Sequence, residues 1–211
     1  MGRLADLDAV TLDVNGTLVG LLDPVPELER ALLERGFERA AEDVRRAFEA
    51  EGRYYTPRSL HGRDPASLHD LQRECARVFL AELAIELDAT EFAPAYVGAL
   101  RFEVLPGVAE AVSDLRSRGL ELAVVGNWDS TLAERLAELQ LAEFFTTIVS
   151  SAEAGTAKPD LAIFELALAR LKVRPDRALH IGDGDADEEG AAAAGMHFEW
   201  APVAQALNAW R

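Results

Sequence analysis

The sequence predicts an α/β fold with a parallel sheet, and three observations support this prediction. Short apolar runs typical of buried strands alternate with stretches whose apolar residues recur every three or four positions, as in amphipathic helices. Several of the apolar runs end in a polar loop. One long interval, residues 19–103, interrupts the alternation with helical patterns only. Strands and helices in alternation favour a parallel sheet that is covered by helices on both faces.

The alternating part of the chain supplies the expected elements of this sheet. Short apolar runs predict strands at residues 10–12, 122–125, 147–149, 178–181 and 197–200. Helical spacing between the runs predicts helices at residues 107–118, 131–139, 161–171 and 188–194. In such sheets ligands bind beyond the carboxyl ends of the strands, which is where the polar loops fall.

Residues 19–103 are interpreted as a helical insertion without strands. Their spacing predicts helices at residues 27–35, 41–51, 67–86 and 91–101, and a segment rich in Gly, Pro, Arg and Tyr predicts a loop at residues 52–64. The insertion directly follows the first polar loop. An insertion at this point can close over a site, exclude water and select the substrate.

Composition and charge exclude several classes of function. The chain has 211 residues with 49% apolar content and a formal charge of -16, and it shows no clustered basic face. Nucleic acid and anionic membrane surfaces are therefore not expected as partners. No stretch approaches the ~20 apolar residues of a membrane span, and the start of the chain lacks a secretory pattern. We expect a soluble, cytoplasmic protein, while its oligomeric state is left open.

Three aspartates predict a metal site. Asp13 ends the first strand, and Gly16 permits a sharp turn, so the Asp13 carboxylate can project as a nucleophile. Asp183 and Asp187 follow a later strand. Bringing three carboxylates together without a cation costs several kcal/mol in repulsion and desolvation. Mg²⁺ removes this cost because it prefers oxygen ligands and engages phosphate.

Lys158 is conspicuous because the chain otherwise uses arginine. Among 21 basic residues only Lys158 and Lys172 are lysine. The ammonium is a compact point charge, unlike the planar guanidinium. A lysine directly before Pro159 therefore suggests a specific charged contact. Cys75, the single cysteine, is expected to be a structural thiol within a helix.

Four segments, taken in order, resemble those of a known family. They are Asp13-Val14-Asn15-Gly16-Thr17-Leu18, Gly126-Asn127, Lys158-Pro159-Asp160, and Gly182-Asp183 with Asp187. Over essentially its whole length the chain resembles the haloacid dehalogenase superfamily, in the branch with a helical cap between the first and second motifs. The resemblance implies a Rossmann-like core of residues 1–18 and 104–211 and a helical cap of residues 19–103.

The resemblance also implies a role for each motif. Asp13 would be the nucleophile and a metal ligand, the main-chain carbonyl of Asn15 would hold Mg²⁺, and Lys158 would neutralise the transferred phosphoryl group. Asp183 and Asp187 would complete the metal site. The residues expected to bind substrate are Gly16, Gly126, Asn127 and Lys158. The implied activity is Mg²⁺-dependent hydrolysis of a small phosphorylated metabolite through an aspartyl-phosphate.

Two positions depart from the family pattern. Phosphatases of this type carry a carboxylic acid two residues after the nucleophile, where it protonates the leaving group and activates water, an effect of ~10²–10⁴-fold. Asn15 occupies that position and cannot transfer a proton. Gly126 stands where a Ser or Thr hydroxyl usually binds phosphate, an expected loss of ~1–3 kcal/mol if nothing replaces it.

Three functions therefore remain open at this point. The first is a slow phosphatase. The second is a 2-haloacid dehalogenase, in which the halide leaves unprotonated, although that branch needs no metal and Asp183 and Asp187 disfavour it. The third is a catalytically impaired relative that binds a phosphorylated ligand or a partner protein.

Other polar residues have structural interpretations at least as good as functional ones. His180 is expected to be a packed strand residue, and Trp128 and Asp129 fit a turn and a helix cap. Acidic residues at a helix N-terminus complement its dipole, which accounts for Asp185, Glu188 and Glu189. Substrate contact and a plain surface loop are equally good interpretations of Arg53, Tyr54, Tyr55, His61 and Arg63.

Overall fold

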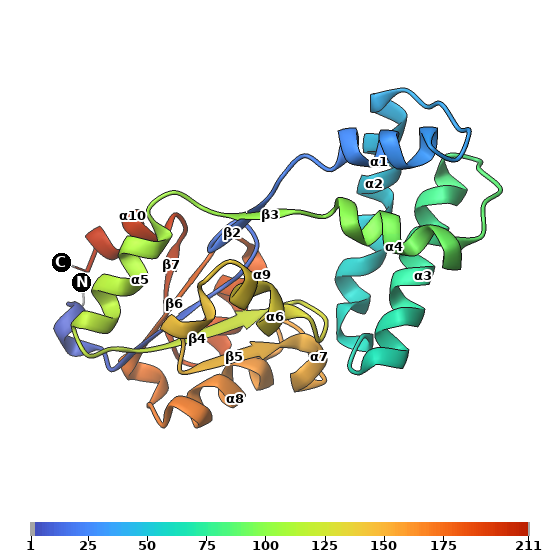
Figure 1. The fold of residues 1–211 in the computed structure, drawn as a ribbon. Coiled ribbons are helices and arrows are strands. Elements are labelled where there is room, and N and C mark those ends of the chain that lie inside the picture. Colours follow the sequence, from blue (N-terminus) through green and yellow to red (C-terminus); the bar gives the residue numbers. More distant parts are fainter. Residues whose placement is uncertain (1–2, 211) are drawn as a thin grey trace. The chain divides into compact units, whose positions relative to one another are not determined.

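The computed structural model describes residues 3–210 and contains a five-stranded sheet (Figure 1). The strands lie in the order β5-β4-β1-β6-β7, and every neighbouring pair is parallel. Their bounds are β1 (Ala9–Leu12), β4 (Glu121–Gly126), β5 (Thr147–Ser150), β6 (Ala178–Gly182) and β7 (His197–Trp200). The predicted α/β fold with a parallel sheet is confirmed.

Strand β1 lies at the centre of this sheet. All four of its side chains are buried, and Thr11 stands opposite Ala123 of β4 and His180 of β6. Burial on both faces explains why the strands are nearly continuous apolar runs rather than alternating ones. Because the strands are parallel, the segments that follow β1, β4 and β6 emerge at the same edge. We call this edge the carboxyl edge.

Helices connect the strands and bury the sheet. Their bounds are α5 (Val108–Ser117), α6 (Leu132–Glu138), α7 (Ser151–Ala154), α8 (Leu161–Leu171), α9 (Asp185–Ala193) and α10 (Val203–Asn208), with short 3₁₀ turns η1 (Leu4–Asp6), η3 (Ala142–Phe144) and η4 (Pro175–Arg177). Helix α8 packs Ile163 and Phe164 into one core cluster with Ala123 and Val149 of the sheet. The helical elements that the sequence did not predict are too short to show a clear period. They are α7, α10 and the 3₁₀ turns.

The chain divides into two compact units. The sheet unit runs up to Gly20 and resumes at Glu103, and the helical unit is Leu21–Phe102. The helical unit contains α1 (Val25–Leu33), α2 (Ala41–Tyr55), η2 (Thr56–His61), α3 (Pro65–Glu82) and α4 (Ala89–Ala99). In its core the Phe79 ring stacks on Phe92 with centroids 6.0 Å apart and meets Tyr96 at 5.2 Å. A hydrophobic core of its own is characteristic of an independent structural unit.

Two expectations for residues 19–103 are wrong. Residues 52–64 are not one loop, because α2 continues to Tyr55 and η2 follows it directly. Pro57 stands in the first turn of η2, where a missing backbone N–H costs nothing. In addition, strand β2 (Val19–Leu21) pairs with β3 (Phe102–Val104), outside the five-stranded sheet. Strands of three residues are too short to show a period in the sequence.

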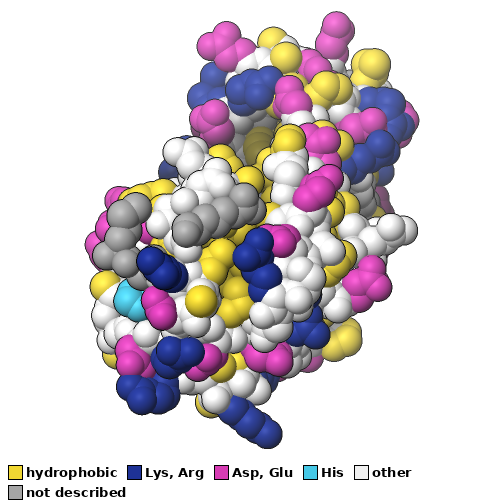
Figure 2. Space-filling model, turned by 90° about the vertical axis from the view of Figure 1, so that its left-hand side faces the viewer, with side chains coloured by type: hydrophobic (Ala, Val, Ile, Leu, Met, Phe, Trp, Pro, Cys, Tyr) yellow, Lys and Arg dark blue, Asp and Glu magenta, His cyan; other side chains and the backbone are white. Residues whose placement is uncertain are grey.

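The surface is charged without a dominant sign on the face drawn in Figure 2, where acidic and basic side chains are intermixed. In the structure as a whole, many charged side chains pair along a helix, as Arg30 does with Glu27 at 2.5 Å and with Glu34 at 2.7 Å. Exposed pairs of this kind contribute about 0–1 kcal/mol each. Among residues 3–210, no helix combines the length and the apolar character that crossing a membrane requires.

The helical unit buries one carboxyl group. Glu51 of α2 is 5% exposed, and its Oε2 accepts a hydrogen bond of 2.6 Å from the Tyr96 hydroxyl. Burial raises the pKa of Glu51, against the opposing hydrogen bonds of Cys75 and Tyr96. The folded state therefore holds the Glu51 proton more tightly than the unfolded state does. Its contribution to stability is complete below the ordinary pKa of 4.5 and is lost as the pH rises through the raised value.

We predict that Glu51→Gln stabilises the protein at pH 8 and not at pH 4. The amide keeps an acceptor for Tyr96 and carries no charge that must be buried. Calorimetric Tm values of parent and variant should diverge as the pH rises. Glu49→Gln, an exposed position of the same helix, is the matched control and should show no such divergence. A Tm difference for Glu51→Gln that is constant with pH would contradict the assignment.

Candidate functional site

The carboxyl edge brings three aspartates together. Asp13 follows β1, Asp183 follows β6, and Asp187 lies in the first turn of α9. One carboxylate oxygen from each lies within 4.8 Å of the others. Asp13 and Asp187 are buried, whereas Asp183 is exposed. These oxygens form a donor set of the kind that a hard divalent cation requires.

A tight loop after β1 presents Asp13. The Asp13 backbone N–H donates to the Ile181 carbonyl of β6 at 2.9 Å, which holds the residue against the neighbouring strand. The Val14 carbonyl then accepts from the N–H groups of Leu18, at 2.8 Å, and of Val19, at 2.9 Å. These bonds turn the chain back on itself within a few residues. Backbone hydrogen bonds at both ends of the loop therefore fix the position from which the Asp13 side chain extends.

Gly16 and Asn15 form the exposed tip of this loop. Gly16 has a φ of +81°, and a Cβ at this position would collide with the carboxylate of Asp183. Only glycine therefore lets the loop approach Asp183. The backbone of Asn15 bridges to Val19, and the residue is exposed.

A buried ammonium group joins two of the aspartates. Lys158 Nζ contacts Oδ1 of Asp13 and donates to Oδ1 of Asp187 at 2.5 Å. Burial by itself would lower the pKa of Lys158, but the charges of Asp13 and Asp187 outweigh it and raise the pKa above its ordinary value. Lys158 therefore stays positively charged. Three carboxylates and one ammonium leave the cluster with two negative charges, which a divalent cation neutralises.

Asn127 holds the backbone of Lys158. Its side-chain Oδ1 accepts from the Lys158 N–H at 2.8 Å, and its Nδ2 donates to the Lys158 carbonyl at 3.1 Å. This pair of bonds ties the end of β4 to the loop before α8. The sequence predicts that Asn127 contacts substrate, and that contact stays a prediction. The structure directs its amide toward the protein, where it fixes the position from which Lys158 extends.

Gly126 ends β4 beside the first loop. A Cβ at this position would overlap Cγ2 of Val14. The space in which a serine or threonine would begin is therefore filled by the Val14 side chain. Close packing against Val14 therefore accompanies the departure from the family pattern at position 126. A side chain with a hydroxyl could enter there only if Val14 moved.

Asp187 is held through both of its oxygens. Oδ1 accepts from Lys158 and from His180 Nε2, the latter at 3.0 Å, and Oδ2 accepts from the Gly184 N–H at 3.2 Å. Burial by itself would raise the pKa of Asp187, but the His180 hydrogen bond and the Lys158 charge outweigh it and lower the pKa to about 2. Gly182 leaves room for this side chain, since a Cβ there would overlap Asp187.

Asp183 differs from the other two aspartates. Its partial burial raises its pKa, and the negative charges of Asp13 and Asp187 raise it further. A carboxylate that is repelled by its neighbours and still reaches solvent is well suited to gain a cation as partner. The donor set and the unbalanced charge both fit a divalent metal at this point.

His180 makes polar contacts that the sequence analysis does not predict. It was interpreted as a packed strand residue, and it is indeed fully buried in β6. Its ring nitrogens, however, bond to Thr11 Oγ1 at 2.7 Å and to Asp187 Oδ1 at 3.0 Å. Burial lowers the pKa of His180, so the imidazole is neutral. The signal in the sequence was a polar residue inside an otherwise apolar strand.

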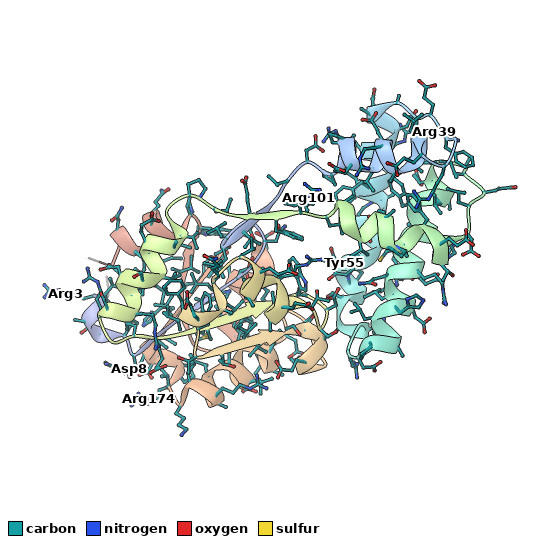
Figure 3. The ribbon with its side chains drawn as sticks, in the orientation of Figure 1. Arg3, Asp8, Arg39, Tyr55, Arg101 and Arg174 are labelled. Atoms are coloured by element: carbon teal, nitrogen blue, oxygen red, sulfur yellow. The ribbon has the colours of Figure 1, made fainter. Side chains whose placement is uncertain are left out.

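The remaining candidates are distributed over both units. Asp129 caps a turn, accepting from the backbone N–H of Thr131 at 2.9 Å and from its hydroxyl at 2.6 Å, and the Trp128 N–H bonds to Ser151 at 3.1 Å. Asp185 and Glu188 lie in the first turn of α9. Five candidates belong to the helical unit, where Tyr55 ends α2 (Figure 3): Arg53, Tyr54, Tyr55, His61 and Arg63.

This geometry can perform nucleophilic chemistry at a charged centre. Asp13 offers a carboxylate oxygen, Lys158 offers a fixed positive charge beside it, and Asp183 and Asp187 supply further oxygens for a cation. A nucleophile held next to fixed positive charge suits attack on an anionic substrate such as a phosphate ester.

Comparisons with known proteins agree with this geometry. A family model described as "haloacid dehalogenase-like hydrolase" matches residues 7–195. The mouse haloacid dehalogenase-like hydrolase domain-containing protein 3 is 33% identical over 93% of this chain and 82% of its own length. Its Xenopus laevis counterpart is 40% identical over 44% of this chain and 39% of its own. The alignments thus span between about two fifths and four fifths of these relatives.

Phosphatases and solved structures are also among the similar proteins. The phosphoglycolate phosphatase of Pseudomonas putida is 30% identical over 89% of this chain and 66% of its own length. A candidate β-phosphoglucomutase of Thermotoga maritima superposes with a TM-score of 0.74 over 96% of this chain and 98% of its own, at 21% identity. That structural likeness shows the fold alone. The family match over most of the sequence shows that this chain belongs to the haloacid dehalogenase-like hydrolases.

Proposed function

We propose that this protein is a Mg²⁺-dependent hydrolase of small phosphomonoesters that works through an aspartyl-phosphate on Asp13. The observation that carries the proposal is the convergence of Asp13, Asp183 and Asp187, of which Asp13 and Asp187 contact the buried ammonium of Lys158. Phosphatases among the similar proteins support it. The net charge of -16 supports a small phosphorylated metabolite, rather than nucleic acid, as substrate.

The chain offers specific ligands for the metal. Asp13, Asp183 and Asp187 would hold Mg²⁺ through their carboxylates, together with the main-chain carbonyl of Asn15. When bound, the ion supplies positive charge that draws the phosphate oxygens toward the nucleophile. The helical unit follows the nucleophile loop directly in sequence, and we propose that it is the cap that selects the substrate.

The reaction has two steps on Asp13. A carboxylate oxygen of Asp13 attacks phosphorus, the P–O bond to the alcohol breaks, and the alkoxide leaves with the electron pair and takes a proton from solvent. Water then attacks the phosphorus of the aspartyl-phosphate and loses a proton to solvent, the P–O bond to Asp13 breaks, and orthophosphate departs. Lys158 offsets the negative charge that gathers on the phosphoryl group in both steps.

Asn15 limits both steps. The leaving alkoxide needs a proton in the first step, and the attacking water must lose one in the second. A carboxamide does neither. We therefore propose that turnover is slow and that it favours leaving groups which depart without a proton. This selectivity is a property of residue 15 and not of the metal site.

The dehalogenase alternative shares the nucleophile but not its surroundings. Displacement of halide from a haloacid needs no cation. The three converging aspartates would then leave two negative charges facing an anionic substrate, which repels it. The metal site therefore favours phosphate ester hydrolysis. A catalytically impaired relative would keep the same metal and phosphate sites and would differ only in turnover.

The first prediction concerns the metal. Mg²⁺ should raise the stability of the parent, by about 2.7 kcal/mol at a concentration 100 times its Kd. Asp183→Asn should abolish most of this gain, as measured by calorimetric titration and by the shift in Tm. Asp185→Asn removes the same charge from an exposed residue two positions away and serves as the control. If the two variants bind Mg²⁺ equally well, the metal assignment is wrong.

The second prediction concerns Lys158. Lys158→Met keeps the length of the side chain and leaves two buried carboxylates without their shared cation, which should cost roughly 3–5 kcal/mol of stability. Orthophosphate binding should weaken as well, and Mg²⁺ should restore Tm more in the variant than in the parent. Lys172→Met, at the exposed end of α8, is the matched control. Parent-like orthophosphate affinity in Lys158→Met would place the phosphate elsewhere.

The third prediction concerns Asn15. Asn15→Asp adds a group that can transfer a proton and leaves the main-chain carbonyl in place. For an alkyl phosphate we expect a gain in kcat of about 10-fold or more, within the ~10²–10⁴-fold range of general acid catalysis. For an activated aryl phosphate the gain should be smaller. Asp13→Asn must abolish the activity in both backgrounds. Equal activity of the parent and the Asn15→Asp variant on every ester would show that residue 15 is not the missing acid.

A further inference from the structure

A chain of hydrogen bonds runs beneath the aspartates of the carboxyl edge. Thr11 Oγ1 bonds to His180 Nδ1 at 2.7 Å, and His180 Nε2 bonds to Asp187 Oδ1 at 3.0 Å. The same Oδ1 also accepts from Lys158 Nζ. Thr11 and His180 have no solvent exposure, and Asp187 is 3% exposed. This row of polar groups therefore links the interior of the sheet to the nucleophile through Lys158.

The sheet builds this row from two neighbouring strands. Thr11 of β1 and His180 of β6 are register partners, so their side chains lie side by side on one face. That face is otherwise apolar: the Phe164 ring meets the imidazole edge-on, with centroids 4.9 Å apart. An imidazole in such surroundings is costly unless both of its nitrogens are bonded. Thr11 and Asp187 satisfy the two nitrogens.

The partners determine where the imidazole carries its proton. The Asp187 carboxylate can only accept a hydrogen bond, so Nε2 must be the protonated nitrogen. Nδ1 is then an acceptor, and the Thr11 hydroxyl donates to it. One arrangement of donors satisfies the whole row. The imidazole thus presents a fixed N–H to Asp187. This hydrogen bond holds the carboxylate of Asp187 in one orientation.

We propose that His180 is a positioning residue, which together with Thr11 holds Asp187 in the orientation that places Lys158 against Asp13. The inference rests on the proposed function of the site. His180 is buried beneath Asp187 and reaches the reaction only through it. Without the imidazole, Asp187 loses one of its two bonds to Oδ1, and the ammonium of Lys158 is no longer confined between two fixed carboxylates. Partners of this kind typically change metal affinity or activity by roughly 10–100-fold.

Two variants separate positioning from packing. His180→Gln places an amide N–H close to the place of Nε2, whereas His180→Asn is one methylene shorter, matches the Nδ1 side and cannot reach Asp187. Both put an amide in the same apolar site. We expect His180→Asn to lose about 10–100-fold in Mg²⁺ affinity and in kcat, and His180→Gln to recover most of this loss. Equal losses in both variants, or none in either, would overturn the proposal.

A measurement on the parent protein needs no variant to fold and no turnover. The ¹⁵N resonances of the imidazole should show a protonated Nε2 and an unprotonated Nδ1, with the His180 signals identified by their absence from His180→Gln. An Nε2 that carries no proton would overturn the inference even in an active enzyme. If the parent neither binds Mg²⁺ nor hydrolyses phosphate esters, the proposed function fails, and the imidazole spectrum still decides whether His180 donates to Asp187.

Discussion

The contact on which the site depends is the buried ammonium of Lys158 between Asp13 and Asp187. It joins three parts of the chain that are distant in sequence: the end of β1, the loop before α8 and the first turn of α9. Removing any one member leaves a buried charge without its partner. The free energy cost of that unpaired charge is much larger than the net stabilisation that the intact ion pair contributes. Asn127 secures the backbone of the lysine, and His180 secures one carboxylate, so the charges meet in one arrangement.

Close approach at this edge requires residues without side chains. Gly16 gives room to Asp183, Gly126 gives room to Val14, and Gly182 gives room to Asp187. At each position a Cβ would overlap the neighbour. Gly16 also has a positive φ, which a turn requires, whereas the other two glycines are explained only by what lies against them. The glycines and the charged residues thus act together to bring the loops of neighbouring strands into contact.

Much of the fold could be predicted because its elements have a local signature. The strands of the sheet are apolar runs, and α8 and α5 are periodic, so their existence follows from composition and spacing. The errors fall where the signature is short or misleading. Residues 52–64 looked like a loop because of their glycine and proline, yet Pro57 only begins η2. Strands β2 and β3 exist because they pair with each other, and neither shows this alone.

The sequence by itself determined how the strands of the sheet and the longer helices follow one another along the chain, the acidic residues that close the strands and the absence of an acid at position 15. Tertiary structure alone decided how these residues are held. The contacts of His180 with Thr11, of Asn127 with Lys158 and of Val14 with Gly126 join segments that are close only because parallel strands lie side by side. A periodic pattern records which face of an element is buried. It does not record which neighbour a polar side chain meets there, because that depends on strand order and register.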